Sequence, residues 1–112
     1  MSESLPRHPL PETELARIRE LEARYNAWQA MLPALQAAQV QWREARALLA
    51  ELQHYYHGGQ WMQDVQADEQ GRMPADMPRG ILAEDTLWNA FHQEWQLAVE
   101  WVQLGAEALK RD

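Results

Sequence analysis

A seven-residue repeat of large apolar side chains runs through the first half of the chain and limits what it can fold into. One series consists of Leu21, Trp28, Leu35, Trp42, Leu49 and Tyr56, and a second consists of Ile18, Tyr25 and Leu32. Two such series place their side chains along one face of an α-helix and are typical of a coiled-coil seam. The repeat predicts helix from about Thr13 to Tyr56, with a long apolar stripe that needs a surface to cover it.

Pro33 lies inside this repeat and leaves two arrangements open. Proline removes a backbone donor and clashes with the preceding turn, so we expect a break or a kink near Met31–Leu32. Either one kinked helix spans the stretch, or two helices meet at Pro33 as a hairpin. We favour two helices, at about residues 12–31 and 33–56, because proline also suits the first position of a helix.

A second helical pattern occupies the C-terminal end of the chain. Trp88, Trp95, Val102 and Leu109 share one seven-residue spacing, and Phe91, Ala98 and Gly105 share another. Glu84 and Asp85 at the start, and Lys110 at the end, complement the helix dipole. The pattern predicts a final helix over about residues 84–110.

The segment between the two patterns, residues 55–89, contains four of the five glycines, together with Pro74 and Pro78. It is longer than a simple helix-to-helix turn, which runs about 2–8 residues. It is also too apolar for a disordered linker, since it carries Trp61, Met62, Val65, Met73, Met77, Ile81 and Leu82. We therefore expect an ordered connector, with a short helix at about residues 60–67.

Length and charge limit the class of protein. The 112 residues correspond to one domain, and we expect residues 1–11 to form a flexible tail and residues 12–112 a single helical domain. A formal net charge of −7 argues against binding to nucleic acid or to anionic membranes. The chain has no cysteine and no apolar run of membrane-spanning length, and its first residues lack the apolar core expected of a signal peptide, so we expect a cytoplasmic protein.

These patterns together predict an all-α fold. We expect a small antiparallel helical bundle, or a coiled-coil-like hairpin, with a long ordered connector before the last helix. Glycines at the end of the first helical half, Gly58 and Gly59, fit a helix terminus because glycine takes positive φ without strain.

Candidate functional residues gather in and around the connector: Tyr55, Tyr56, Trp61, Asp64, Asp68, Glu69, Arg79, Glu84 and Asp85. Asp64 and Asp68 are four residues apart and share a helix face if the short helix extends as far as Asp68, and carboxylates are the ligands that Mg²⁺ and Mn²⁺ prefer. Asp64, Asp68, Glu84 and Asp85 are therefore possible metal ligands. No known metal motif is present, and we favour the interpretation that these carboxylates cap helices and pair with Arg72 and Arg79.

The connector also resembles a bacterial family called domain of unknown function 4298. The similarity rests on Tyr55-Tyr56, Trp61, Asp64, Ala67-Asp68-Glu69, Gly71, Met73-Pro74, Arg79-Gly80-Ile81-Leu82 and Glu84-Asp85. Two serines of the family pattern are replaced here by Gly58 and Ala83, and alanine is a poor helix cap. The resemblance implies no activity, no cofactor and no catalytic residue.

We therefore expect a non-enzymatic protein that binds other proteins, either as an adaptor or as a homo-oligomer such as a homodimer. The aromatic residues would serve as helix core or as anchors for a partner. The alternative is a small metal-dependent hydrolase of phosphorylated metabolites, with the connector carboxylates as ligands. We assign no catalytic residue and no cofactor.

Overall fold

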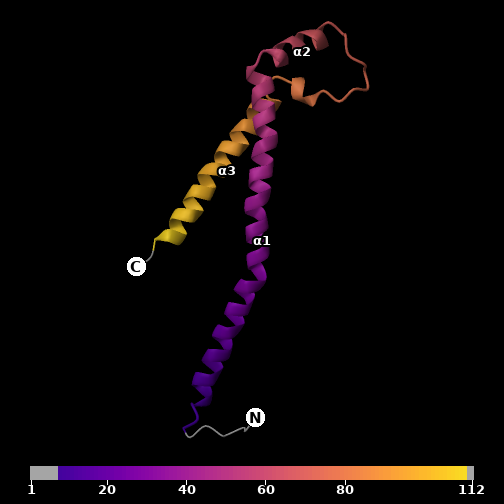
Figure 1. Cartoon of the computed structure of the whole chain (residues 1–112). Helices are drawn as coiled ribbons and strands as arrows, with labels where there is room; N and C mark the ends of the chain where they lie inside the picture. The colour runs from indigo at the N-terminus through magenta and orange to yellow at the C-terminus, as the bar shows by residue number, and fades with distance from the viewer. Residues whose placement is uncertain (1–7, 111–112) are drawn as a thin grey trace. The chain divides into compact units, whose positions relative to one another are not determined.

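The computed structural model describes residues 8–110, and in that range it contains helices and no strand. The elements are α1 (Glu12–His57), α2 (Gln60–Glu69), a short 3₁₀ helix η1 (Gly80–Leu82) and α3 (Thr86–Leu109) (Figure 1). The all-α prediction is confirmed, with a long first helix and a connector before the last. Of the predicted tail, residues 1–7 lie outside the described range.

α1 passes through Pro33 as a single helix, so the two-helix interpretation is wrong. The residues around it explain why. Residues 27–38 contain, besides the proline, only Ala, Leu, Gln, Met and Trp, and none of the Gly, Asn or Ser that a hairpin turn uses. Most of these are strong helix formers. The fixed φ of proline is itself helical, so the helix loses one hydrogen bond and continues.

Two compact units divide the described chain, one ending at Gln41 and the other beginning at Trp42. The N-terminal unit is one stretch of α1, and α1 buries none of its side chains. Its heptad residues Ile18, Leu21, Tyr25, Trp28 and Leu35 are all exposed. The single helical domain expected over residues 12–112 stays a prediction.

The C-terminal unit contains the end of α1, the connector and α3. Gly59, with φ of 91°, redirects the chain from α1 into α2, a conformation that only glycine adopts without strain. η1 packs against both α2 and α3. Among residues 8–110 the buried hydrophobic side chains are Trp61 and Leu87, so the core lies where the connector meets the helix ends.

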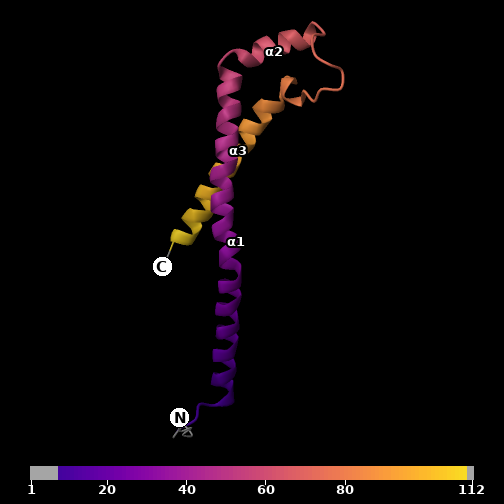
Figure 2. The same cartoon turned by 45° about the vertical axis from the view of Figure 1, so that its right-hand side comes forward.

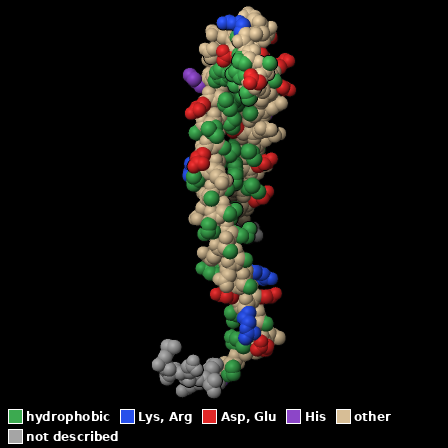
Figure 3. Space-filling model, turned by 90° about the vertical axis from the view of Figure 1, so that its right-hand side faces the viewer, with side chains coloured by type: hydrophobic (Ala, Val, Ile, Leu, Met, Phe, Trp, Pro, Cys, Tyr) green, Lys and Arg blue, Asp and Glu red, His purple; other side chains and the backbone are tan. Residues whose placement is uncertain are grey.

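α3 runs back along the last third of α1, from Trp42 to His57 (Figures 1 and 2). No Cα atom of α3 comes within 8 Å of one in this part of α1. The two helices are therefore joined by long side chains rather than by close backbone packing. On the face seen in Figure 3 many hydrophobic side chains reach the surface. None of the helices within residues 8–110 combines the length and hydropathy that a membrane crossing requires.

Candidate functional site

Tyr55 and Asp64 form the centre of the connector site. Tyr55 lies near the end of α1 and Asp64 in α2, and the turn at Gly58–Gly59 brings them together. The hydroxyl of Tyr55 donates a hydrogen bond of 2.6 Å to Oδ2 of Asp64. Nε2 of Gln60 donates a second, of 2.9 Å, to Oδ1 of the same carboxylate. Both oxygens of Asp64 are thus engaged within the chain.

This pair changes the acidity of both groups. Partial burial, together with the hydrogen bond to the Asp64 carboxylate and its charge, raises the pKa of Tyr55 to about 12. The hydrogen bonds from Tyr55 and Gln60 lower the pKa of Asp64, against a smaller opposing effect of burial. At neutral pH the site therefore holds a neutral phenol and an ionised carboxylate.

Arg79 joins the connector loop to α2. Its Nε lies 2.9 Å from Oδ1 of Asp68, and both side chains are about two-thirds shielded from solvent. Its NH1 donates a 2.9 Å hydrogen bond to the carbonyl of Pro74. Pairing with Asp68 was one of the arrangements expected for Arg79. Of the other expected partners, Asp64 is bound by Tyr55 and Gln60, and Glu84 is exposed.

Trp61 fixes the far end of the connector. Its indole Nε1 donates a 2.8 Å hydrogen bond to the carbonyl of Ile81 in η1. Its ring lies 4.8 Å from that of Tyr56, which in turn packs edge-on against Phe91 of α3 at 5.6 Å. These rings connect α1, α2, η1 and α3, so they act as core.

A cleft of about 280 Å³ opens beside the Tyr55–Asp64 pair. Its wall is formed by that pair, by Arg79 and by apolar residues of the connector: Met73, Met77, Pro78, Ile81 and Leu82. The polar groups of Tyr55, Asp64 and Arg79 are already hydrogen-bonded or ion-paired within the chain. Within the described chain no buried side-chain nitrogen or oxygen lacks a partner.

The remaining predicted site residues do not join this cluster. Glu69, Glu84 and Asp85 are exposed. Asp85 occupies the N-cap of α3 but makes no side-chain capping bond. Across residues 8–110 no three His, Asp or Glu side chains converge as a metal site. The four proposed metal ligands are therefore not brought together, and Asp64 and Asp68 have separate partners.

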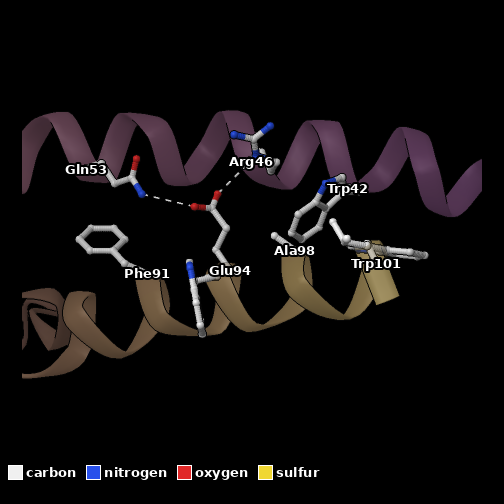
Figure 4. Close-up of a pocket in the computed structure, with 9 residues that line it drawn as sticks. Trp42, Arg46, Gln53, Phe91, Glu94, Ala98 and Trp101 are labelled. Carbon is white, nitrogen blue, oxygen red and sulfur yellow. Dashed lines mark hydrogen bonds and ion pairs between the residues drawn. The ribbon is translucent and has the colours of Figure 1, made fainter. Parts of the chain in front are cut away.

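A second polar site lies between α1 and α3, and the sequence analysis missed it. Glu94 of α3 points toward α1, where its two carboxylate oxygens meet Arg46 and Gln53 (Figure 4). Arg46 Nε lies 3.7 Å from Oε2, and Gln53 Nε2 donates to Oε1 at 3.4 Å. Trp42 and Trp101 close one end with ring centres 6.2 Å apart. The cleft has a volume of about 570 Å³.

The position of Glu94 in the heptad series already indicates that it pairs across the two helices. It stands midway between Phe91 and Ala98, in the series that faces α1, where an apolar residue is expected. Arg46 and Gln53 are seven residues apart and interrupt the apolar series of α1 in the same way. An acidic residue in one heptad seam, with an arginine and a glutamine in the other that can pair with it, predicts that these seams face each other.

Comparison with known proteins agrees with the resemblance noted in the sequence. A family model described as domain of unknown function (DUF4298) matches residues 18–104. The match includes the connector and most of both long helices. No curated protein and no solved structure matches the chain.

Proposed function

The chain belongs to the DUF4298 family, and we propose that it is a non-enzymatic protein whose helices bind another protein chain, either a second copy or a different protein. The observation that carries the proposal is the amount of ordered apolar surface that the described residues leave uncovered. Each unit contributes to it separately.

In the N-terminal unit, α1 presents an apolar heptad stripe with no other element of that unit packed against it. Tyr25, Trp28 and Met31 each expose more than half of their side chains. Most of the stability of a helix in water comes from packing its apolar face rather than from intrinsic propensity. A helix of this length, spaced as a coiled-coil seam, is suited to a helical partner.

In the C-terminal unit, the buried core is small for the number of residues. Trp61 and Leu87 are buried, whereas Trp95 of α3 is 65% exposed and Val102 is 71% exposed. Contiguous apolar patches of this kind mark protein-binding surfaces in soluble proteins. Exposed Trp is also the residue type most enriched among residues that dominate binding energy.

The metal-dependent hydrolase has no comparable support. A hydrolytic metal ion needs converging ligands and an open coordination position. Asp64 is instead held by Tyr55 and Gln60, and Asp68 by Arg79. The proposal therefore treats the connector carboxylates as the groups that hold the connector on the helices.

Light scattering coupled to size exclusion, across micromolar to high-micromolar protein, tests the proposal. We expect either a dimer or higher oligomer, or a monomer that forms a stoichiometric complex with a co-purified protein after both are purified separately and mixed. A chain that stays monomeric at every concentration and retains no partner would end the proposal. Titration calorimetry with Mg²⁺ and Mn²⁺ tests the hydrolase in parallel, and millimolar affinity or better would revive it.

A further inference from the structure

α3 carries two apolar seams, and α1 lies over the inner one. The inner seam, which includes Phe91, Ala98 and Trp101, lines the cleft shared with α1, and Trp95 and Val102 of the second seam also line this cleft. The outer seam is offset by one residue and alternates four- and three-residue spacing: Trp88, His92, Trp95, Val99, Val102 and Ala106. Such spacing defines a second helix-packing face.

We propose that a second copy of this chain covers the outer seam, with the two α3 helices antiparallel and a two-fold axis that passes between the two seams at the level of residue 97. The inference rests on the proposed function and deepens it by naming the partner and the surface. The outer seam consists of two interleaved series, one of Trp88, Trp95 and Val102 and one of His92, Val99 and Ala106. In an antiparallel pair, each residue of one series faces a residue of the other series in the second copy. Here Trp88 faces Ala106 of the second copy, His92 faces Val102, and Trp95 faces Val99.

The sizes of the side chains favour this arrangement. The first half of the outer seam is bulky and the second half is small, so the antiparallel pair places a large side chain against a small one at every level. Well-packed helix interfaces alternate large and small residues in this way. A parallel pair would instead set Trp88 and Trp95 against their own copies and leave Val99 and Ala106 with too little to fill the gap.

Two hollows on the surface of α3 fit the side-chain sizes along the outer seam. A hollow of about 320 Å³ lies among Trp88, Phe91, His92 and Trp95. A second hollow, of about 260 Å³, lies over the small half of the seam, between Trp95 and Val102. Antiparallel pairing brings the small half of one copy to the first hollow and the bulky half to the second.

The flanks of the outer seam carry no charge, which matters for a chain with a formal net charge of −7. One flank consists of Asn89, Gln96 and Gln103, and the other of Phe91, Ala98 and Gly105. Two acidic molecules repel each other unless their contact surfaces are neutral or complementary.

The available area indicates a dimer that dissociates readily. Trp88 and Trp95 are each more than half exposed. A tryptophan buries about 150–250 Å² in an interface, so the two indoles of one copy offer on the order of 200 Å². With the smaller seam residues, the dimer falls among the small specific interfaces, below about 1,200 Å² in total. We expect dissociation in the micromolar range.

The first test is the oligomeric state of a matched pair of variants of the full chain. Val102→Glu places a carboxylate in the outer seam, and we expect the dimer dissociation constant to rise about 100-fold or more, because each copy would bury an unpaired charge. Leu104→Glu, on the same helix and 58% exposed but off the seam, is the control and should change it less than about threefold. Far-ultraviolet circular dichroism checks that both variants keep their helix content.

The second test fixes the orientation and uses the absence of native cysteine. His92→Cys and Val102→Cys are prepared separately, mixed and oxidised. Antiparallel pairing predicts disulfide-linked dimers in the mixture and little linkage in either variant alone. Linkage of each variant alone as fast as in the mixture would show a parallel pair and overturn the inference.

The antiparallel dimer and the proposed function can be excluded separately. If the natural chain dimerises but Val102→Glu dimerises as well as Leu104→Glu does, the interface lies elsewhere and only this inference is lost. If the natural chain is monomeric at all concentrations yet forms a purified complex with another protein, the second copy is excluded while the proposed function stands. A monomer with no partner removes both.

Discussion

The hydroxyl of Tyr55 donates a 2.6 Å hydrogen bond to Oδ2 of Asp64, and this bond joins the end of α1 to α2. We expect Tyr55→Phe to lower the free energy of unfolding by about 1 kcal/mol, the usual net contribution of one hydrogen bond. Tyr25→Phe, in the exposed face of the N-terminal unit, is the control and should change it little. Thermal unfolding measures both. Equal effects would show that the bond does not stabilise the fold.

The same pair predicts how stability depends on pH. The pKa of Tyr55 is raised from 10.0 to about 12, so its contribution is complete below pH 10 and is lost as the pH rises through about 12. The pKa of Asp64 is lowered from 3.8, so its contribution is complete above that value and is lost as the pH falls through the lowered pKa. Near-ultraviolet absorbance should show one phenol titrating near pH 12, and Tyr55→Phe should remove it.

The sequence predicted the fold class well because the signals were local and repeated. Heptad spacing identifies helices without any tertiary information, and the Gly58–Gly59 pair marks the end of α1 by backbone chemistry alone. The prediction of two helices that meet at Pro33 was wrong because this question is not decided by one residue alone. Proline penalises a helix by a fixed amount, but whether the helix breaks depends on the alternatives that the neighbouring residues offer.

The candidate site was predicted only in part. The sequence identified the pairing of Arg79 with Asp68 as one possibility, because charges in a segment with buried apolar groups need partners. It did not identify Tyr55 as the donor to Asp64, which depends on the direction in which α2 leaves α1. Spatial convergence of Glu84 and Asp85 with the others likewise depends on the path of the connector, and no spacing rule encodes it.

Trp61 holds η1 through the 2.8 Å hydrogen bond to the carbonyl of Ile81. We expect Trp61→Phe to lower the free energy of unfolding by about 2 kcal/mol, because it leaves this carbonyl without its donor and removes part of a buried ring. Amide hydrogen exchange should become faster from Gly71 to Leu82. Trp28→Phe, which changes a half-exposed ring in the N-terminal unit, should leave both measurements nearly unchanged.

Amide exchange in the connector can contradict this role of Trp61. If Trp61→Phe leaves amide exchange in the connector as slow as in the natural chain, the indole hydrogen bond does not hold the connector. The hydrogen bond of Tyr55 to Asp64 and the ion pair of Arg79 with Asp68 would then hold it.

Glu94 is a carboxylate with only 17% of its side chain exposed, and its cationic partner Arg46 is 62% exposed. Ion pairs with a solvent-exposed member contribute at most about 1 kcal/mol, and a shielded charge loses solvation. We therefore expect Glu94→Leu to leave the free energy of unfolding unchanged or to raise it by up to about 1 kcal/mol. The part of its salt dependence that comes from the Glu94–Arg46 pair should disappear. Glu100→Leu, at an exposed position, is the control for added apolar surface. A loss of more than about 1 kcal/mol in Glu94→Leu would show that the network with Arg46 and Gln53 stabilises the helix pair.

Pro33 offers the sharpest test of α1 as one helix. An internal proline costs a helix about 3 kcal/mol relative to alanine, so we expect Pro33→Ala to raise the free energy of unfolding by up to that amount and to increase the helical circular dichroism signal. Pro78→Ala, in the connector, is the control. It should be neutral or slightly destabilising, since it only frees the unfolded chain. If residues 31–33 instead formed a hairpin turn in solution, Pro33→Ala would lower stability, because a helix-starting proline would be lost at the turn.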